Sequence, residues 1–596
     1  MTLFGFSPPF GFFSPFGSLT RVAPALICLV GMGSLGCSQG PQTEIPAFRE
    51  TAGAATKAQN IRSISDPERE VLTPLFENVA AEKGIDATFD SDTVPDRYFL
   101  PEIMGGGAAW LDYDRDGWLD VYLANGTAFE PGQEPLPRAN WLYRSRGGET
   151  FELLSETIGA ADSGYGQGVA PGDFDADGFP DLYIGNFQEN HLHVNNGDGT
   201  FSLCPPEVGV NDTHWTSSVV WVDLNHDDLL DLYVTNYLRM TLDDRKVCEY
   251  QGNPGYCGPG QYEAAPDSVF ISRGDGTFVE ASAELGLQDT TGKGLAVVIA
   301  DFNDDRNPEI YVGNDMTSNF LYRRVERPTE EYEEVAELSG VAQSGEGMNE
   351  ATMGIACSDF NLDGLPDLYL THYFNMQNTL YLNHGDLQFE DASRRAGTAH
   401  TAFPYLGFGT IPIDYNRDGF DDLFVTNGHV LGPKVLPDRM RPQLLRNVNG
   451  RKFEEESTRL GEYFSKAWLG RSTASGDFDN DGDLDILVTH LDEPAALLQN
   501  HSRGEGTFIG IQLETPSRIP PIGAKVTIRT ETETRSRSFQ SGGSYLASHD
   551  SRLLFSVDEG QSSIDVVVDW PDGSRQEFLA LPTGRYWQIL QGSTPW

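Results

Sequence analysis

The sequence predicts an all-β protein, a seven-bladed β-propeller followed by a small antiparallel β domain. Three observations give this prediction. One short acidic motif returns seven times, and segments rich in β-branched and aromatic residues flank each copy. The 64 Gly and 35 Pro among 596 residues favour short strands and many turns over long helices. With 39% hydrophobic residues, the chain is too apolar to be disordered.

The chain is strongly acidic, with 89 Asp and Glu against 41 Lys and Arg and a formal net charge of −48. A phosphate backbone would be repelled, so no nucleic acid partner is expected. The acidity is open to two interpretations, a solvated acidic surface or carboxylates gathered to hold cations. The positions of the acids in the sequence decide between them.

The N-terminal residues predict export. Residues 1–36 contain no Asp, Glu or Lys and include an apolar stretch at 22–35, which indicates a signal peptide. Cys37 follows directly, as at the lipidation site of bacterial lipoproteins, although Ser34 stands where Leu is usual. We expect lipidation of Cys37, with ordinary cleavage nearby and release as the alternative. Residues 37–71 are polar and aperiodic and are expected to form a flexible tether. The predicted location is the outer membrane or cell surface through the lipid anchor only, or otherwise the periplasm or the medium.

Four further cysteines remain after Cys28 and Cys37. Cys248 and Cys257 are nine residues apart in a Gly- and Pro-rich segment, and export permits disulfides, so we predict that these two are joined. Cys204 and Cys357 could also pair, which the sequence leaves open.

The repeated motif has the form D-x-[DN]-x-D-G-x-x-D. Its starts are separated by 61, 50, 78, 58, 55 and 63 residues. We number the copies acidic loops 1 to 7, spanning residues 112–120, 173–181, 223–231, 301–309, 359–367, 414–422 and 477–485. The candidate metal ligands stand at positions 1, 3, 5 and 9 of each loop: Asp112, Asp114, Asp116 and Asp120; Asp173, Asp175, Asp177 and Asp181; Asp223, Asn225, Asp227 and Asp231; Asp301, Asn303, Asp305 and Glu309; Asp359, Asn361, Asp363 and Asp367; Asp414, Asn416, Asp418 and Asp422; Asp477, Asp479, Asp481 and Asp485.

This spacing predicts calcium binding. Side chains at positions 1, 3 and 5 of a tight loop converge on one point, a Gly at position 6 allows a left-handed turn, and residues 7 and 9 can complete an oxygen shell. Oxygen ligands at this density favour Ca²⁺ over Mg²⁺, so up to seven Ca²⁺ ions are expected. An EF-hand would need Glu at position 12, where loop 1 has Leu123. A solvated acidic turn without a metal would explain one copy of the motif. Seven copies in equivalent hairpins favour calcium binding over this interpretation.

Two loops depart from the pattern. Asp228 and Arg306 replace the glycine at position 6 of loops 3 and 4, and Glu309 replaces Asp at position 9 of loop 4. Asp tolerates the left-handed geometry that position 6 needs, whereas Arg tolerates it less and brings a positive charge. Glu309 is one methylene longer than the Asp it replaces. We therefore expect loops 3 and 4 to bind calcium last or not at all.

Each acidic loop is expected to join two antiparallel strands of a four-stranded blade. An aromatic residue begins a strand before each loop: Phe76, Phe151, Phe201, Phe278, Tyr332, Phe389 and Phe453. The strand at Phe76 has no blade of its own, and the seventh blade lacks a fourth strand. We predict that the strand at Phe76 completes the seventh blade and closes the ring.

The histidines give no clear catalytic pattern. His372 and His490 occupy a position that other repeats fill with Asn, which favours a hydrogen-bonding role in a turn over catalysis. His429 is one residue different and remains a candidate. Because no nucleophile motif, Walker loop or HExxH motif is found, no enzymatic activity is predicted and no catalytic residue is assigned.

These repeats resemble the FG-GAP/VCBS repeats of calcium propellers. Residues 72–596 resemble the cartilage acidic protein family, whose bacterial members are often exported. The tail resembles the ASPIC/UnbV domain through the segments Ile522-Gly-Ala-Lys-Val, Gly542-Gly-Ser-Tyr-Leu, Arg552-Leu-Leu-Phe and Val568-Asp-Trp-Pro-Asp-Gly. The resemblance implies extracellular calcium binding and adhesion or matrix interaction, and no established reaction.

The predicted domains are thus a propeller at 72–503 and a β domain at 504–596. The expected function is an adhesion or ligand-binding module for an extracellular glycan or protein. The insertion at 237–265 is the candidate contact surface, unless it merely covers a neighbouring blade. The alternative is a carbohydrate-active enzyme, such as a polysaccharide lyase built on a calcium propeller, in which His429 would take part.

Overall fold

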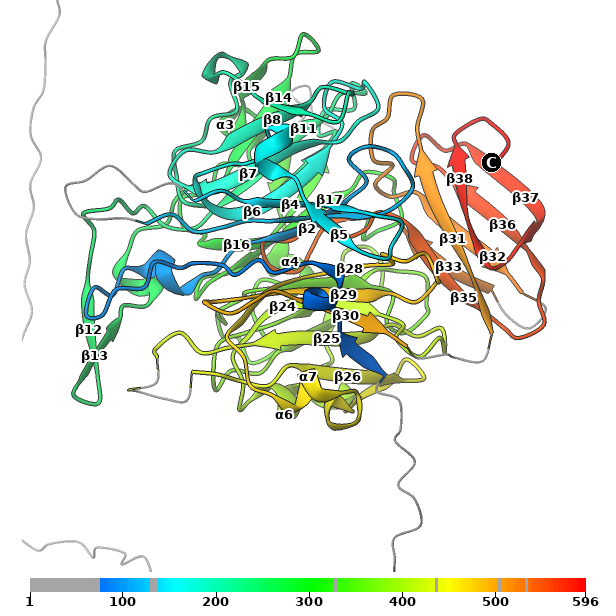
Figure 1. Cartoon of the computed structure of the whole chain (residues 1–596). Helices are drawn as coiled ribbons and strands as arrows, with labels where there is room; N and C mark the ends of the chain where they lie inside the picture. Colours follow the sequence, from blue (N-terminus) through cyan, green and yellow to red (C-terminus); the bar gives the residue numbers. More distant parts are fainter. Residues whose placement is uncertain are drawn as a thin grey trace, which may run out of the picture. The chain divides into compact units, whose positions relative to one another are not determined.

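The computed structural model describes residues 75–128, 138–325, 331–432, 434, 438–501, 506–530 and 534–595, all within one compact unit, Leu72–Trp596. The predicted signal peptide, Cys37 and the tether lie outside the described residues. The all-β class is confirmed (Figure 1). Among the residues described, no helix has the length and apolar character that crossing a membrane requires.

Seven antiparallel sheets, each with four strands from the residues before 502, follow one another along the described chain, and we call them blades 1 to 7 in chain order. The sheet of blade 4 takes up a fifth strand from the C-terminal part of the chain, and a separate two-stranded sheet lies in the insertion of blade 3. Blade 1 contains β2 (Ala108–Leu111), β3 (Asp120–Leu123), β4 (Trp141–Ser145) and β5 (Phe151–Leu153); blade 2 contains β6 (Tyr165–Gly172), β7 (Asp181–Phe187), β8 (His191–Asn195) and β9 (Phe201–Leu203); blade 3 contains β10 (Thr216–Val222), β11 (Asp231–Asn236), β14 (Ser268–Ser272) and β15 (Phe278–Glu280). Blade 4 contains β16 (Gly294–Ala300), β17 (Glu309–Asn314), β18 (Phe320–Val325) and β19 (Glu331–Glu334); blade 5 contains β20 (Ile355–Ser358), β21 (Asp367–Leu370), β22 (Thr379–Asn383) and β23 (Phe389–Asp391). Blade 6 contains β24 (Gly407–Ile413), β25 (Asp422–Asn427), β26 (Gln443–Val448) and β27 (Lys452–Glu455); blade 7 contains β28 (Gly470–Gly476), β29 (Asp485–His490), β30 (Ala496–Asn500) and β1 (Phe76–Asn78).

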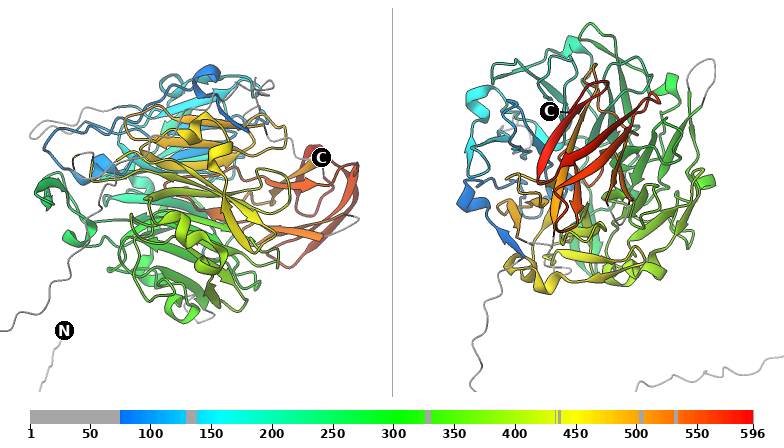
Figure 2. Two further views of the ribbon diagram at one scale, coloured as in Figure 1. Left: turned by 90° about the horizontal axis from the view of Figure 1, so that it is seen from below. Right: turned by 90° about the vertical axis from the view of Figure 1, so that its right-hand side faces the viewer.

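The blades are arranged as in a propeller. The innermost strands β2, β6, β10, β16, β20, β24 and β28 contact one another in this order, and β28 contacts β2. The ring therefore has no open end between its first and last blades. The right view of Figure 2 looks along this arrangement, with the blades surrounding the C-terminal strands.

The N-terminal strand closes the ring. In β1, Phe76 pairs with Asn500 and Asn78 pairs with Leu498, so this strand is the outer edge of the sheet that holds β28, β29 and β30. The prediction that the strand at Phe76 completes the seventh blade is confirmed. Because the first described strand and the last blade strand share one sheet, both ends of the ring are fastened by backbone hydrogen bonds.

Short helices connect the blades. The α-helices are α1 (Ala80–Lys83), α2 (Ser155–Ile158), α3 (Ser282–Leu285), α4 (Ala336–Ser339), α5 (Ser393–Ala396), α6 (Thr398–Ala402) and α7 (Glu462–Ser465), and the 3₁₀ turns are Leu100–Ile103, Pro206–Val208, Pro259–Gln261 and Ser457–Arg459. Five of the α-helices are followed by a glycine with a left-handed backbone: Gly84, Gly159, Gly286, Gly340 and Gly397. This glycine ends each helix after about one turn and turns the chain toward the next blade.

The second strand of each blade supplies the core. Its motif begins with the last acidic residue of the loop and continues with aliphatic and aromatic residues that are fully buried, as in Asp231–Asn236 and Glu309–Asn314. Tyr183 and Tyr311 lie within these strands at 0% exposure. Their hydroxyls donate to the backbone carbonyls of Val210 and Val341, respectively. Such buried hydroxyls need a partner, which each finds in a connecting turn.

The C-terminal domain consists of β31 (Thr507–Glu514), β32 (Lys525–Arg529), β33 (Thr534–Ser538), β35 (Leu553–Val557), β36 (Ser563–Asp569), β37 (Arg575–Pro582) and β38 (Arg585–Leu590). They form two sheets, with the orders β35-β31-β38 and β33-β32-β36-β37. The prediction of a purely antiparallel domain is wrong in one place, because β31 and β38 are parallel. The chain crosses from the second sheet back to the first after β37, which brings β38 in beside β31 in the same direction.

One segment of this domain reaches into the ring. The short strand β34 (Ser541–Gly542) pairs with β16 of blade 4, Ser544 forms a bridge with Ile355 of blade 5, and Ser548 forms a bridge with Ala109 of blade 1. Tyr545, between these two bridges, has 0% exposure. The segment 541–549 therefore occupies the centre of the ring, between innermost strands of different blades.

Candidate functional site

The seven acidic loops lie at equivalent places. Each joins the first and second strand of its blade, as loop 1 joins β2 to β3 and loop 7 joins β28 to β29. These strand pairs are antiparallel, so the predicted placement of the loops in hairpins is confirmed. The position 1 residues of loops 1, 2, 5 and 6 line one cavity, which places these loops on the same side of the ring.

The backbone of the seven loops follows one pattern. Positions 4 and 6 have positive φ in every loop: Arg115 and Gly117, Ala176 and Gly178, His226 and Asp228, Asp304 and Arg306, Leu362 and Gly364, Arg417 and Gly419, Asn480 and Gly482. Asp228 at φ 64° and Arg306 at φ 73° share the left-handed region with the five glycines. A side chain there costs about 1 kcal/mol relative to glycine. Loops 3 and 4 thus keep the loop conformation at an energetic cost.

Backbone amides hold two of the carboxylates. In all seven loops the position 6 N–H donates to the position 1 carboxylate, at 2.8 to 3.1 Å: the acceptors are Asp112, Asp173, Asp223, Asp301, Asp359, Asp414 and Asp477. The position 7 N–H likewise donates to the position 5 carboxylate: Asp116, Asp177, Asp227, Asp305, Asp363, Asp418 and Asp481. One oxygen of each carboxylate is fixed in this way, which orients the other.

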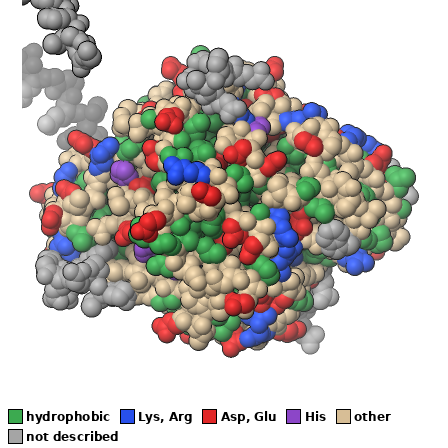
Figure 3. All heavy atoms as spheres, turned by 90° about the horizontal axis from the view of Figure 1, so that it is seen from above, with side chains coloured by type: hydrophobic (Ala, Val, Ile, Leu, Met, Phe, Trp, Pro, Cys, Tyr) green, Lys and Arg blue, Asp and Glu red, His purple; other side chains and the backbone are tan. Residues whose placement is uncertain are grey.

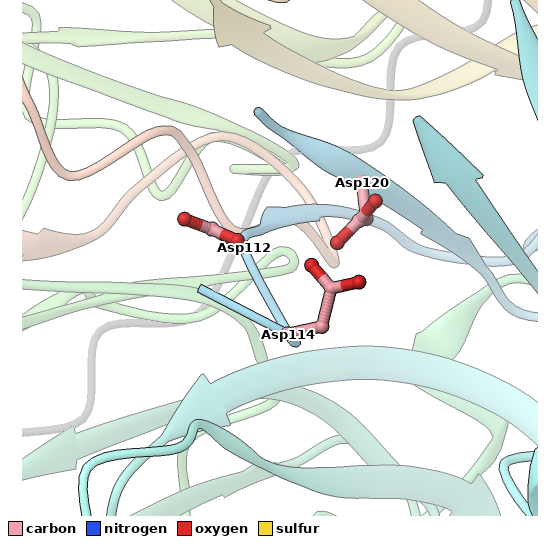
Figure 4. Close-up of side chains that lie close together, drawn as sticks. All are labelled: Asp112, Asp114 and Asp120. Atoms are coloured by element: carbon pink, nitrogen blue, oxygen red, sulfur yellow. The ribbon is translucent and has the colours of Figure 1, made fainter. Parts of the chain in front are cut away.

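Three loops bring carboxylates together. In loops 1, 2 and 7, ligand atoms from positions 1, 3 and 9 lie within 4.8 Å of one another: Asp112, Asp114 and Asp120; Asp173, Asp175 and Asp181; Asp477, Asp479 and Asp485. Figure 4 shows the loop 1 group, in which the carboxylates of Asp114 and Asp120 face each other. The position 5 residues, also predicted as ligands, stand outside these three groups and are exposed in every loop.

Loops 3 to 6 have Asn at position 3, and its amide is used within the loop. The Nδ2 groups of Asn225, Asn303, Asn361 and Asn416 donate to the position 5 carboxylates at 2.9 to 3.1 Å. In loops 3 to 6 an uncharged amide therefore donates a hydrogen bond to the position 5 carboxylate, whereas loops 1, 2 and 7 have a charged carboxylate at position 3. The loops therefore fall into two chemical classes on one backbone.

The carboxylates fit a cation. Asp114 Oδ1, Asp173 Oδ1, Asp414 Oδ1 and Asp479 Oδ1 are buried oxygens with no hydrogen-bond donor. A buried carboxylate oxygen without a partner is unfavourable, and a hard cation is the partner that such a group of oxygens prefers. Burial raises the pKa of Asp173 to about 6 and, with the charge of Asp175 adding to it, the pKa of Asp181 to about 8. Without a cation, ionisation of these groups is opposed by their surroundings.

The position 9 acid also has a structural role. It is buried in every loop, at 0% or 1% exposure. In loop 5, Asp367 Oδ2 accepts from the Phe360 N–H at 3.0 Å and Oδ1 accepts from the Asn383 N–H at 2.8 Å. One carboxylate thereby ties the loop to the third strand of its own blade. The sequence indicated only a metal ligand at this position.

Asparagines at the end of the third strand link neighbouring blades, a role that the sequence analysis missed. The Nδ2 group of Asn383 donates to the Phe302 carbonyl of loop 4 at 2.7 Å, and that of Asn447 donates to the Phe360 carbonyl of loop 5 at 2.8 Å. Asn195 and Asn500 make the same bond to the preceding loop. The recurring Asn at the end of these strands was the signal that could have revealed them.

Acidic side chains outside the loops are dispersed. Figure 3 shows red carboxylates spread over the viewed face, with Arg and Lys side chains among them. The position 5 residues belong to the exposed acids, whereas the position 9 residues are buried. The acids therefore divide into an exposed, solvated set and a buried set gathered in the loops.

A cavity of about 480 Å³ lies beside the loops. Its walls include the position 1 residues of loops 1, 2, 5 and 6 on one side and Lys525, Arg535, Arg537 and Arg552 of the C-terminal domain on the other. The Arg537 guanidinium forms two hydrogen bonds of 2.6 Å to Asp421, and Arg552 pairs with Asp550 at 2.8 Å. Arg537 therefore joins the C-terminal domain to loop 6 at this cavity, whereas Arg552 is paired with a carboxylate of its own domain.

The histidines at the recurring turn position of the blades are buried hydrogen-bonding residues. The backbone N–H of His372 donates to Asn378 Oδ1 at 2.9 Å, as that of Asn186 does to Asn190 Oδ1 at 2.7 Å. The His372 ring nitrogen Nε2 is hydrogen-bonded to Thr379 Oγ1 at 3.0 Å. The predicted turn role is confirmed for His372.

His429 is 2% exposed and lies against the rings of Tyr373 and Phe374. Burial lowers the pKa of this imidazole to about 4. A neutral imidazole so enclosed has little access to a substrate.

The predicted disulfide is present, since Cys248 and Cys257 are joined across the hairpin of β12 (Val247–Tyr250) and β13 (Asn253–Tyr256). Cys204 and Cys357 are free thiols, the first half-buried and the second buried. The Tyr256 hydroxyl donates to Glu102 Oε2 at 2.7 Å, so the insertion packs on the segment that precedes blade 1. At this contact the insertion covers the 3₁₀ turn Leu100–Ile103, which belongs to no blade.

Comparisons with known proteins identify two kinds of domain. The description "ASPIC and UnbV" matches residues 514–595, and "FG-GAP-like repeat" matches residues 112–184, 173–234, 359–425 and 414–488. Loop 4 lies outside these matches. The chain is 25% identical over 310 residues to cartilage acidic protein 1 of Xenopus tropicalis, covering 51% of this chain and 45% of that protein, and 24% identical over 318 residues to the Homo sapiens protein, covering 52% and 46%. The chain spans about half the length of the curated relatives it matches.

Similar solved structures include an Agrocybe aegerita lectin that recognises non-reducing terminal N-acetylglucosamine, with a TM-score of 0.36, 12% identity and coverage of 67% of this chain and 95% of that one. Another is BBS1N in complex with ARL6DN, with a TM-score of 0.37, 10% identity and coverage of 70% and 98%.

Proposed function

The chain belongs to the cartilage acidic protein family, and on this premise we propose that it is an exported, calcium-binding β-propeller that acts as a ligand-binding module. Export and anchoring through Cys37 rest on the N-terminal sequence. The ligand is an extracellular glycan or protein. A module of this kind needs a rigid ring that presents loops and insertions at fixed places.

The observation that supports calcium binding most strongly is the set of buried carboxylate oxygens without a donor in loops that share one backbone. The residues that would hold the ions are those at positions 1, 3, 5 and 9. Calcium supplies positive charge that offsets carboxylate repulsion within each loop. The chain itself orients the carboxylates through the position 6 and position 7 amides, before any ion binds.

The contact surface proposed for the ligand is the insertion at 237–265, which is attached by the Cys248–Cys257 disulfide. Its exposed edge includes Val247, at 57% exposure. Val247 is therefore the side chain of this disulfide-closed hairpin at which contact with a ligand is tested.

Calcium binding is tested by elemental analysis and thermal unfolding of the mature chain. Protein passed over a chelating resin and returned to calcium should bind several ions per chain and unfold at a clearly higher temperature than protein in EDTA. Calcium at 100 times the dissociation constant stabilises by about 2.7 kcal/mol for each site. Equal melting temperatures together with no bound metal would contradict the proposal. Seven sites of equal affinity would contradict the weaker binding expected of loops 3 and 4.

The ligand is sought by screening the calcium-loaded chain against polysaccharides and matrix proteins, with binding and cleavage scored together. Binding without turnover is the expected result, and it should fall when Val247 is changed to Asp. The matched control is Leu203→Asp, at a side chain that is 56% exposed on blade 2. Cleavage that is lost in His429→Ala would instead identify an enzyme.

A further inference from the structure

Hydroxyl groups of the C-terminal domain donate to carboxylates of two acidic loops. Ser556 Oγ donates to Asp414 Oδ2 of loop 6 at 2.6 Å, and the Tyr586 hydroxyl donates to Asp477 Oδ2 of loop 7 at 2.6 Å. Both acceptors stand at position 1, the first candidate ligand of each loop. These contacts join residues 142 and 109 positions apart in the sequence.

Each of these carboxylates is held by two donors on one oxygen. Asp414 Oδ2 also accepts from the Gly419 N–H at 3.0 Å, and Asp414 Oδ1 is buried without a donor. Asp477 Oδ2 also accepts from the Gly482 N–H at 2.8 Å. Two donors on Oδ2 restrict rotation of the carboxylate and leave Oδ1 directed into the loop. The hydroxyls therefore act on the orientation of the candidate ligands.

Cationic side chains of the same domain reinforce these contacts. Arg552 donates to the Asp477 carbonyl at 2.7 Å and to Asn480 Oδ1 at 2.6 Å, and Lys525 Nζ donates to the Gly364 carbonyl of loop 5 at 2.8 Å. A Cβ placed on Gly419 would collide with the Arg535 guanidinium, so that group lies directly against the backbone of loop 6. The domain thus contacts three successive loops through polar side chains.

The same domain fills the centre of the ring. Ser544 Oγ donates to the Thr473 carbonyl of blade 7 at 2.7 Å, and the Tyr545 hydroxyl donates to the Met104 carbonyl at 3.1 Å. The segment 541–549 lies between β33 and β35, and β35 carries Ser556. Movement at the loops and movement of the central segment are therefore linked through one short stretch of chain.

We propose that the C-terminal domain completes the cation sites of loops 6 and 7, with Ser556 and Tyr586 as positioning residues, so that cation binding in these loops and docking of the domain are coupled. The proposal rests on the calcium binding proposed above. Coupling is reciprocal: a docked domain strengthens cation binding in the two loops, and a bound cation strengthens docking.

The positioning role is tested by equilibrium dialysis against calcium with Tyr586→Phe and Ser556→Ala. Each change removes one hydroxyl, so one site should require on the order of tenfold more free calcium for half-filling while the others are unchanged. Ser556→Thr keeps a hydroxyl and should restore the wild-type curve. Ser574→Ala, at a serine that bonds Gln591 in the same domain, is the control. Unchanged binding in both Tyr586→Phe and Ser556→Ala would overturn the positioning role.

Docking is followed by hydrogen–deuterium exchange of the segment 541–549, with the peptide over β8 of blade 2 as an internal reference, because β8 contains no candidate ligand and its blade carries none of the substitutions. Removal of calcium should accelerate exchange of 541–549 about tenfold or more, beyond any change in β8. The double variant Asp414→Asn, Asp477→Asn should show this fast exchange even in calcium. The matched double variant Asp223→Asn, Asp301→Asn, in loops 3 and 4, should not.

The outcomes separate the two proposals. If elemental analysis finds no calcium on the wild-type chain, calcium binding itself fails and coupling fails with it. If calcium binds but exchange of 541–549 is the same with and without it, only the coupling is overturned. If both double variants accelerate exchange equally, the effect is one of general stability and the special role of loops 6 and 7 is wrong.

Discussion

Blades 3 and 4 and blades 5 to 7 share one loop conformation but differ in the residues that support it. Loops 5 to 7 have glycine at position 6, whereas loops 3 and 4 have Asp228 and Arg306 at the same positive φ. The third strands of blades 5 and 7 end in an Asn that reaches the preceding loop, and that of blade 6 carries this Asn one residue before its end. The third strand of blade 3 ends in Ser272 instead. The C-terminal domain donates to residues of loops 5, 6 and 7.

Blade 4 replaces the linking Asn by other groups. The Arg324 guanidinium donates to the Asn225 carbonyl of loop 3 at 3.3 Å, and the Tyr332 hydroxyl donates to the Leu224 carbonyl at 3.1 Å. The carbonyl that Asn satisfies elsewhere is therefore satisfied here by a tyrosine. The loop backbone is therefore determined by the spacing of residues within the loop. The hydrogen bonds that tie the loop to the next blade depend on residues of that blade, and these residues vary.

The largest effect is expected from removing a linking asparagine. Asn447→Ala should destabilise the calcium-loaded protein by about 3 kcal/mol, because it leaves the buried carbonyls of Phe360 and Asp421 without their donor. Asn447→Ser gives blade 6 the residue found in blade 3 and should be nearly as destabilising. Chemical denaturation measures both. Asn196→Ala, at an exposed side chain in a hairpin turn of blade 2, should stay within about 0.5 kcal/mol, and equal losses in all three variants would refute the linking role.

A second effect concerns pH and uses the histidine of blade 5. Burial lowers the pKa of His372 from 6.5 to about 4. As the pH falls below 6.5 the unfolded chain takes up this proton first, so the stability contributed by the neutral ring is lost between about pH 6.5 and 4. His372→Asn places there the residue that blades 3 and 4 use, and it should reduce the loss from pH 7 to pH 5 by about 2 kcal/mol.

This prediction is checked by comparing unfolding free energies of wild type and His372→Asn at pH 7, 6 and 5 in calcium. His384→Asn, at an exposed histidine whose side chain is 52% accessible, serves as the control and should leave the slope unchanged. Parallel pH profiles for wild type and His372→Asn would show that the pKa of this ring is the same in the folded and unfolded chain, contrary to expectation.

The smallest effect is expected from giving loop 4 its missing glycine. Arg306→Gly should stabilise the protein by about 1 kcal/mol, because glycine adopts the φ of 73° without strain. It should also raise the calcium affinity of loop 4, which calcium titration would detect as one additional tight site. Arg306→Asn should have an unfolding free energy between those of wild type and Arg306→Gly, because Asn tolerates the left-handed region better than Arg does. A loss of stability in Arg306→Gly would show that the guanidinium beside Gly573 contributes more than the backbone strain costs.

The sequence predicted those features that depend on short-range spacing. Asp112, Asp114 and Asp120 lie within nine residues, so their convergence followed from the motif. The strand at Phe76 could be assigned to blade 7 because a four-stranded blade was one strand short. The disulfide was equally local, since Cys248 and Cys257 are nine positions apart in the sequence.

Contacts over long sequence separations could not be predicted. Asn447 reaches a carbonyl 87 residues away, and Ser556 reaches a carboxylate 142 residues away. These contacts depend on how blades and domains pack, and no local pattern around Ser556 or Tyr586 indicates a partner. The parallel pairing of β31 with β38 was missed for the same reason, since alternation of side chains within a strand does not reveal the direction of its neighbour.

The position of 541–549 in the middle of the blades has a consequence for biosynthesis. A ribosome releases all seven blades before it releases this segment, so the blades can begin to assemble while the space between their innermost strands still holds water. The backbone pairing with Ile355 and Ala109 forms only when the last part of the chain arrives. The centre of the ring can therefore be filled only after the residues of all seven blades have been synthesised, and we expect a chain that ends after blade 7 to leave this centre open to water.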